Sequence, residues 1–374
     1  MKKLIYFFLC LYASALAAQE ITSFKDGYQL KNDLIIFRAT LNGSSIVKFK
    51  PFKASINPFD WCLGVEDQPG INKNGFDFEG HFLSLGTWGM PTDGEQRAGV
   101  KLYGDANQKK WVIDSVESQP TLKTMYTSFH STIEKLDVSR AVSVPAKGGV
   151  IKITETVHNN LPIGRPYNIL QHATFGGQFV DNSIIFSNAG EGFTQKGSFP
   201  RKDYNEVSKN AFIWPNGILG KDTLNLQTTG VVKRTFLTSH IVKDSIGWAV
   251  IYQPEQNLFV GYVWKTKEYP WVNFWQQYKK GKINGRAIEF ATCGMGISFQ
   301  EMMENDRKFY GRNSFDYIDA GENITRSYYA FTSLLNEKIV EVISVRLEKE
   351  AVILQLKNEH GAVIKKQFMI SSFE

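Results

Sequence analysis

The sequence predicts an all-β fold, organised as a large sandwich of long antiparallel strands. Short runs rich in Val, Ile, Thr, Phe and Tyr recur along the chain, and Gly, Asn, Asp and Pro separate them. Apolar and polar residues alternate within these runs, which is typical of strands. Amphipathic helices are almost absent, since the nearest candidate, residues 299–308, has no clear apolar stripe at helical spacing. The length of 374 residues favours a large sandwich over a barrel.

Four segments show the strand pattern clearly. They are residues 33–40, 150–157, 258–264 and 351–356. We find no internal repeat and no low-complexity linker between them. The strand pattern therefore runs through the whole chain after the N-terminal segment.

One domain boundary is indicated near residues 335–337. Beyond it, residues 339–373 alternate as three or four strands with a turn at residues 358–361. We therefore predict a main β-sandwich over residues 19–335 and a small C-terminal β-appendage over residues 336–374. The alternative is that these strands are the last ones of the main sheet.

The first eighteen residues have the composition of a secretory signal peptide. Lys2 and Lys3 precede an apolar run over residues 4–16, and small residues follow it. The run is shorter than the roughly 20 residues that span a bilayer. We expect cleavage near Ala17 or Ala18, a secreted or periplasmic mature protein, and no stable membrane insertion.

Charge and cysteine content limit the function classes. The formal net charge of +6 includes the two N-terminal lysines, and the other basic residues are scattered, so we expect no nucleic-acid partner. After cleavage Cys62 and Cys293 remain, in a compartment where they can pair or stay as thiols. No His, Asp or Glu cluster has metal-ligand spacing, so we expect no metal and no cofactor.

Aromatic residues make up 13% of the chain, which is high. The apolar faces of a pyranose stack well on aromatic rings, so an exported β-protein of this composition is a candidate sugar binder. A Phe-rich sandwich core would give the same composition. Only the positions of the aromatic residues can separate the two interpretations.

Polar and aromatic side chains concentrate among glycines in three segments, residues 78–111, 155–176 and 271–294. A β-scaffold would display such segments as a site on a concave face. The candidate substrate-binding residues in them are His81, Trp88, Arg97, Tyr103, Asn273, Trp275 and Gln276.

These segments resemble the galactose mutarotase-like (aldose 1-epimerase) superfamily. The second segment is similar to its Asn-(two or three residues)-His strand, here Asn168 to His172, and the third to the strand with an isolated Glu before a Thr, here Glu289. The first is similar to the hexose-phosphate-epimerase branch. Residues 315–334, with Gly321-Glu322, resemble the closing turn and last strands. The resemblance covers about residues 50–335 and implies the large mutarotase-like supersandwich.

The resemblance implies a mutarotase-like isomerase that opens the ring of a mono- or oligosaccharide by acid and base catalysis. Matched residue by residue, Glu289 would be the base that takes the anomeric hydroxyl proton, and His172 the acid that protonates the ring oxygen. Glu289 lies among apolar residues, which tends to raise a carboxyl pKa. The structural alternatives are an outward-facing Glu289 or a partner for Arg286, and a core histidine at 172.

Three departures from the family pattern limit which polar groups and which substrate we expect at the site. Tyr103 stands where the first motif has His, and a phenol can donate and accept a hydrogen bond but cannot supply the same charge. His81 is the alternative for that role. Glu79 and Asn107 stand where Arg residues would hold a phosphate, so we expect an unphosphorylated sugar.

Two other functions remain open at this point. One is a non-catalytic carbohydrate-binding or accessory protein that lost turnover when the first His became Tyr. The other is a lyase or hydrolase on the same scaffold, because one fold hosts several chemistries. The sequence leaves the sugar, the preferred anomer and the oligomeric state open.

Overall fold

The structure is a computed structural model that describes residues 20–68, 75–195, 211–230, 232–304 and 308–373. The predicted signal peptide, residues 1–18, lies outside the described residues.

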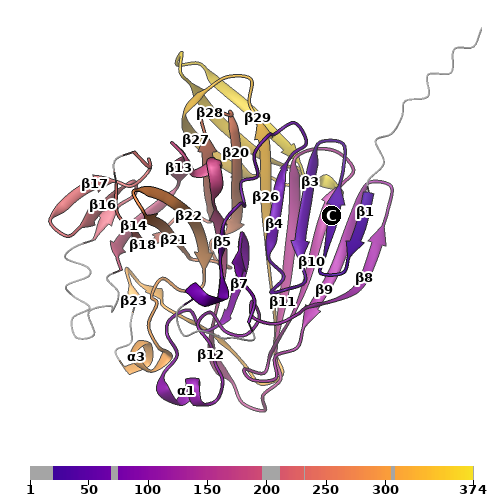
Figure 1. The fold of residues 1–374 in the computed structure, drawn as a ribbon, viewed down its shortest axis with the longest axis vertical. Coiled ribbons are helices and arrows are strands. Elements are labelled where there is room, and N and C mark those ends of the chain that lie inside the picture. Colours follow the sequence, from indigo (N-terminus) through magenta and orange to yellow (C-terminus); the bar gives the residue numbers. More distant parts are fainter. Residues whose placement is uncertain (1–19, 69–74, 196–210, 231, 305–307, 374) are drawn as a thin grey trace, which may run out of the picture.

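Two large antiparallel sheets form the body of the molecule (Figure 1). Over the described residues, the first sheet has twelve strands, eleven of them in the order β1-β2-β3-β4-β7-β12-β22-β21-β18-β14-β15, with β25 beside β12. Their bounds are β1 Glu20–Phe24, β2 Gly27–Lys31, β3 Ile35–Thr40, β4 Ile46–Pro51, β7 His81–Gly86, β12 Arg165–Phe175, β14 Ala189–Thr194, β15 Phe212–Ile213, β18 Phe236–Val242, β21 Trp271–Lys279, β22 Lys282–Ala291 and β25 Asp316–Ile318.

The second sheet has eight strands among the described residues, in the order β13-β19-β20-β26-β11-β10-β9-β8. Their bounds are β8 Val112–Ser118, β9 Leu122–Phe129, β10 Leu136–Pro145, β11 Val150–Asn159, β13 Ile184–Ser187, β19 Ile246–Gln253, β20 Leu258–Lys265 and β26 Asn323–Leu334. The prediction of an all-β antiparallel sandwich is confirmed.

Short elements complete the fold. Among the described residues, three two-stranded ribbons consist of β5 Cys62–Leu63 with β6 Phe78–Glu79, β16 Asn216–Leu219 with β17 Asp222–Asn225, and β23 Lys308–Phe309 with β24 Arg312–Asn313. The helical elements in the same part of the chain are α1 Asp93–Arg97, α3 Phe299–Glu304 and the 3₁₀ turns Val65–Asp67, Gly177–Val180 and Ser371–Phe373. Neither α-helix of the described residues could span a bilayer.

The space between the two sheets is filled by apolar side chains that alternate along the strands. Leu83 and Leu85 of β7, Phe290 of β22 and Val142 of β10 are all fully or almost fully buried there. Burying one such side chain stabilises a fold by about 1.5–3 kcal/mol. Because side chains on a strand alternate between faces, each core residue of β7, β12 and β22 has a neighbour that points to the opposite, outer face.

A third, smaller sheet covers part of the second sheet. It consists of β27 Ile339–Leu347, β28 Ala351–Asn358 and β29 Val363–Met369, seen in yellow at the top of Figure 1. Val352, Leu354 and Phe368 pack with Phe259 and Phe331 of the eight-stranded sheet in one apolar cluster. The division of the chain into two domains near residue 335 stays a prediction.

Candidate functional site

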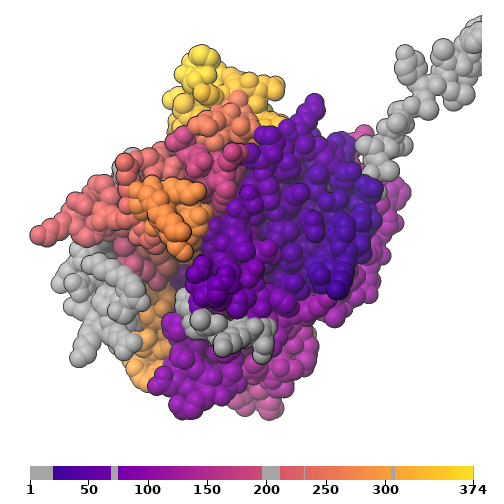
Figure 2. Space-filling model, viewed as in Figure 1, coloured from indigo at the N-terminus to yellow at the C-terminus, as the bar shows by residue number. Residues whose placement is uncertain are grey.

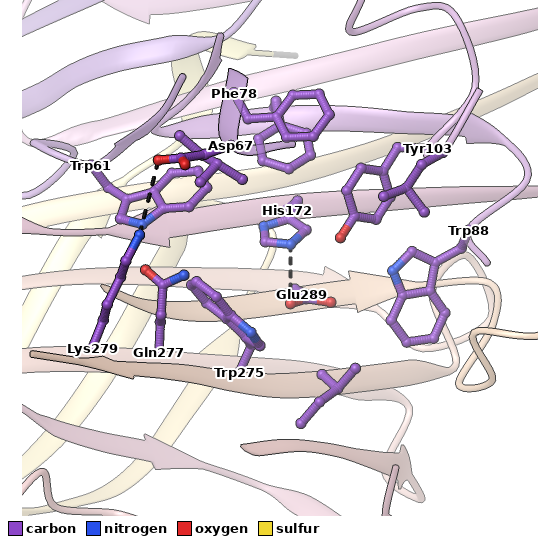
Figure 3. A pocket seen from close by; sticks show the side chains of 14 residues that line it. Trp61, Asp67, Phe78, Trp88, Tyr103, His172, Trp275, Gln277, Lys279 and Glu289 are labelled. Carbon is purple, nitrogen blue, oxygen red and sulfur yellow. Dashed lines mark ion pairs between the residues drawn. The ribbon is translucent and has the colours of Figure 1, made fainter. Parts of the chain in front are cut away.

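A cavity of about 340 Å³ opens on the outer face of the twelve-stranded sheet, the face turned away from the core (Figure 3). This volume is within the range of small-molecule pockets. Strands β12, β21 and β22 form its floor. The lining residues are Trp61, Leu63, Asp67, Phe78, Phe82, Trp88, Leu102, Tyr103, His172, Leu237, Trp275, Gln277, Lys279 and Glu289.

Segments that are far apart in the sequence meet at this pocket. In Figure 2, the orange surface of the β21–β22 hairpin borders the purple surface of segments close to the N-terminus. At this border the Lys279 ammonium lies 3.9 Å from the Asp67 carboxylate. The long-range contact explains why no local motif in the sequence marks the pocket as a whole.

Sheet register places the central polar residues in one row. His172 of β12 is directly opposite Glu289 of β22, and Glu289 is directly opposite Asn273 of β21. On the other side, His172 is opposite Phe82 of β7. Directly opposed residues of antiparallel strands point to the same face, so these four side chains all point to the outer face.

The His172 and Glu289 side chains contact each other at the floor of the pocket. His172 Nε2 lies 3.3 Å from Glu289 Oε1. The other ring nitrogen, Nδ1, lies 2.7 Å from Thr174 Oγ1. The Thr174 hydroxyl also lies 3.5 Å from the His172 carbonyl, to which it donates, so its oxygen is left to accept a proton from Nδ1. This arrangement makes Nε2 the acceptor of the neutral imidazole, facing Glu289.

Burial favours the neutral form of both groups. His172 is 5% exposed and Glu289 is 1% exposed. Loss of solvent disfavours the charged form of each, so burial raises the pKa of Glu289 to about 8 and lowers the pKa of His172 to about 3. At neutral pH the pair therefore holds one proton, shared between Glu289 Oε1 and His172 Nε2.

Aromatic rings surround the pair. The Phe82 ring stacks on the His172 imidazole at 4.3 Å between centroids and 18° between planes. Tyr103 and Trp275 meet the same imidazole edge-on, at 5.7 Å and 6.3 Å. Trp61 in turn packs edge-on against Trp275 at 5.8 Å. The walls are thus suited to the apolar faces of a sugar ring.

Hydrogen bonds to main-chain atoms fix the position of the loop that carries Tyr103. Tyr103 has a φ of +66°, in the left-handed region that residues other than glycine rarely adopt. Its carbonyl accepts a hydrogen bond from Leu85 N at 3.2 Å, and Asp105 N donates to Glu134 Oε2 at 3.1 Å. In Figure 3 the Tyr103 hydroxyl points toward the His172–Glu289 pair. The loop therefore places the Tyr103 hydroxyl near the centre of the pocket.

The two ends of the pocket differ in character. His172 and Glu289 lie in the middle, with Trp88 and Tyr103 on one side (Figure 3). On the other side lie Trp61 and Gln277 together with the Asp67–Lys279 ion pair, whose side chains are 57% and 53% exposed. The pocket is therefore closed and aromatic at one end and open and polar at the other.

The structure brings most of the predicted site residues together. His172, Glu289, Trp88, Tyr103 and Trp275 all line the one pocket. Asn273, which is fully buried beside Glu289 in the sheet, lies behind that lining.

Three predicted residues lie elsewhere. His81 points into the core, where its ring contacts Gln171 Oε1 and the Tyr262 hydroxyl, each at 3.2 Å. Gln276 also faces the core and donates to the Val232 carbonyl. Arg97 is exposed at the end of α1. His81 and Gln276 are each one residue away from a pocket residue, Phe82 and Gln277, because strand side chains alternate between faces.

The structure also adds residues to the pocket that sequence reasoning missed. They are Trp61, Leu63, Asp67, Phe78, Phe82, Leu102, Leu237, Gln277 and Lys279. The signal available for Phe82 and Gln277 was strand parity, because Phe82 is directly opposed to His172 and Gln277 lies two residues after Trp275 on the same face of β21. No sequence signal pointed to Trp61 or Asp67, which reach the pocket from the segment before and after β5.

The structure also tests three alternatives: an Arg286 partner for Glu289, a disulfide between Cys62 and Cys293, and a metal site. The Arg286 guanidinium donates to the carbonyls of Ser183, Leu226 and Gln227, so it is held by main-chain oxygens and not by Glu289. Cys62 is exposed, Cys293 is buried, and neither is in a disulfide. Within the part of the chain that the structure describes, no group of three His, Cys, Asp or Glu residues could hold a metal ion.

Solved structures of low sequence identity share this architecture. A galactose mutarotase-like protein from Clostridium acetobutylicum superposes with a TM-score of 0.59 at 13% identity, over 85% of this chain and 99% of that one. A galactose mutarotase related enzyme from Lactobacillus acidophilus gives 0.54 at 12% identity, over 84% and 100%. A candidate aldose 1-epimerase from Escherichia coli K12 gives 0.56 at 13% identity, over 84% and 100%.

No family model and no curated protein sequence matches the chain. The structural matches nevertheless cover most of this chain and nearly all of each of those three. The chain therefore has the galactose mutarotase-like fold, as the resemblance of its segments predicted.

Proposed function

We propose that the protein is an aldose 1-epimerase-like isomerase that interconverts the anomers of an unphosphorylated sugar. The observation that carries the proposal is the contact of 3.3 Å between His172 Nε2 and Glu289 Oε1 on the floor of an aromatic pocket. The two groups are buried, titratable and share one proton, and they lie in a cleft lined by aromatic rings. Titratable groups in such a cleft are typical of a functional site.

The reaction needs one proton removed from, and one proton added to, the two oxygens that are bonded to the anomeric carbon C1. A base takes the proton of the anomeric hydroxyl O1, the C1–O5 bond breaks, O5 receives a proton, and O1 becomes the aldehyde oxygen. Rotation about C1–C2 and the reverse steps then give the other anomer. Atoms and protons balance, and no oxidant or cofactor is required.

The geometry of the pair suits this exchange. O1 and O5 are bonded to the same carbon, so two neighbouring groups on one side of the sugar can reach both oxygens. When the shared proton lies on His172, Glu289 is the base and His172 the acid, which are the roles implied by the resemblance. The pair returns to its starting protonation after each turnover.

The lining also favours an unphosphorylated substrate. Among the described residues that line the pocket, Lys279 is the only Lys or Arg, and Asp67 is paired with it. Recognition of a phosphate usually uses an arginine fork or several basic groups. Glu79 and Asn107, at the positions where the phosphate-epimerase branch has Arg, do not line the pocket. A sugar linked to further residues would extend toward the exposed end beside Lys279.

We also propose that the mature protein acts outside the cytoplasm, on a mono- or oligosaccharide. The support is the N-terminal sequence, with two lysines, an apolar run and a small-residue cleavage site. N-terminal sequencing of the protein from its host should begin at Ala18 or Gln19. An intact Met1 on soluble cytoplasmic protein would contradict export.

Polarimetry tests the proposed activity. Freshly dissolved single anomers of unphosphorylated aldoses, free and at the reducing end of disaccharides, should equilibrate faster with the protein than in matched buffer. The corresponding sugar phosphates should show little acceleration. If calorimetry shows sugar binding but no aldose equilibrates above the buffer rate, the isomerase proposal fails and the carbohydrate-binding alternative replaces it.

A further inference from the structure

Asn273 has an unusual environment for a buried amide. The side chain is completely buried, yet neither its Oδ1 nor its Nδ2 has a hydrogen-bond partner among the described residues. Buried polar groups in native proteins are nearly always hydrogen-bonded, so an exception calls for an explanation. The second carboxyl oxygen of Glu289, Oε2, is also buried and also lacks a partner within the described chain.

The sheet places these atoms side by side. Asn273 and Glu289 are directly opposed in β21 and β22 and point to the same face. The Cβ atoms of such a pair are about 4.5–5.5 Å apart, a separation that these two side chains can bridge by small rotations. On its other side Asn273 is opposed to Ser239, whose Oγ already accepts from Gln195 Nε2 at 2.6 Å. Glu289 is the opposed residue that has an oxygen, Oε2, without a hydrogen-bond partner among the described residues.

We propose that Asn273 is a positioning residue for Glu289, and the inference rests on the proposed isomerase function. Its Nδ2 donates a hydrogen bond to Glu289 Oε2 during the reaction cycle. Oε2 is then engaged, and Oε1 remains the oxygen that exchanges the proton with His172 Nε2. Asn273 thus acts through Glu289 without touching the sugar, which agrees with its place behind the pocket lining.

The electrostatic consequence has a definite sign. A donor on Oε2 stabilises the carboxylate more than the neutral acid, so Asn273 lowers the pKa of Glu289 against the opposing effect of burial. The other titratable groups that face Glu289 are His172 from β12, Tyr103 from its loop and Cys293 after β22. Asp67 and Lys279 lie at the pocket mouth. In the structure none of these groups donates a hydrogen bond to Oε2.

The test is the Asn273→Leu variant, which keeps the size of the side chain and removes the donor. Infrared difference spectra, with Glu289→Gln as the blank, report the protonation of the Glu289 carboxyl against pH and require no turnover. We expect its pKa to rise by about one unit, which is a tenfold shift in the ionisation equilibrium. We also expect kcat to fall about tenfold with KM unchanged, and the upper limb of the pH profile to move to higher pH.

Gln276→Met is the matched control, because Gln276 is a buried amide on the same strand that faces the core. It should lower thermal stability and leave the Glu289 pKa unchanged. If Asn273→Leu fails to fold, Asn273→Ala gives the same readout. An unchanged Glu289 pKa in the folded variant overturns the proposal, and so does a rise in KM at constant kcat, which would mean that Asn273 contacts the sugar. Absence of turnover in the wild type would instead overturn the proposed function, and the infrared result would still stand.

Discussion

Glu289 Oε1 lies 3.3 Å from His172 Nε2, and the two residues are directly opposed on adjacent strands of one sheet. This position is fixed by main-chain hydrogen bonds of β12 and β22, so neither group needs a flexible loop to reach the other. Two side chains placed on neighbouring strands are held more precisely than two placed on loops. The proton that the two groups share then determines how the site responds to pH.

The pH dependence of turnover follows from that shared proton. Burial raises the pKa of Glu289 to about 8 and lowers the pKa of His172 to about 3, so the form with one proton dominates between these values. We expect kcat/KM to be flat from about pH 5 to 7 and to fall tenfold per unit well above pH 8. Polarimetric rates, corrected for buffer catalysis, provide the measurement. A profile that rises steadily from pH 7 to 9 would contradict the assignment.

The stability of the Glu289→Gln variant should depend on pH in a defined direction. The folded-state pKa of Glu289 is raised, so its contribution to stability is complete below about pH 4.5 and is lost as pH rises through about 8. Glutamine does not titrate. The variant should therefore gain stability relative to the wild type, on the order of 3 kcal/mol between pH 5 and 8.

Urea denaturation at pH 5, 6.5 and 8 measures this difference. His172 is present in both proteins, so its own titration largely cancels in the comparison. A stability difference that is constant over this pH range would show that Glu289 is ionised in the folded protein.

The fold was largely predictable from the sequence, because its signals are local. Period-two alternation over segments such as residues 150–157 marks strands, and these lie within β11 of the structure. The scarcity of helical patterns likewise fits a chain whose described α-helices, α1 and α3, are short. Alternation of this kind does not specify which strands pair, so the order of the sheets could not be derived from it.

The site was predictable only in part, for a physical reason. His172 and Glu289 could be located from the residues around them, but the face on which a buried strand side chain lies depends on register. In β12 and β21 both faces are largely buried, so hydrophobicity does not distinguish Gln276 from Gln277. Trp61 and Asp67 reach the pocket from the segment around β5, by contacts distant in sequence.

Tyr103→Phe tests whether the phenol assists the reaction. The hydroxyl points toward the pair, so its loss should lower kcat/KM about tenfold while the ring still packs against His172. Tyr126→Phe is the control, because the Tyr126 hydroxyl bonds Glu117 on the other sheet. Unchanged rates in Tyr103→Phe would leave the phenol with a packing role alone.

His81→Asn should change stability without changing KM, since His81 faces the core.

Lys279→Ala tests the open end of the pocket. The side chain is half-exposed and its ion pair with Asp67 is long, so its loss should cost little stability. We expect KM for a reducing disaccharide to rise several-fold, with kcat unchanged and with little effect on the monosaccharide. Lys282→Ala, at the opposed and exposed position of the same hairpin, is the control. Equal effects of the two variants would mean that only net charge matters.

The most direct measurement is the rate of anomer interconversion by the wild type and by Glu289→Gln under the same conditions, with sugar binding followed by calorimetry. Glutamine keeps the shape of the side chain but cannot exchange a proton with His172. The account predicts clear acceleration by the wild type, a loss on the order of a hundredfold or more in the variant, and similar sugar affinity in both. Equal rates in the two proteins would contradict the account, because turnover would then not depend on the proton that Glu289 shares with His172.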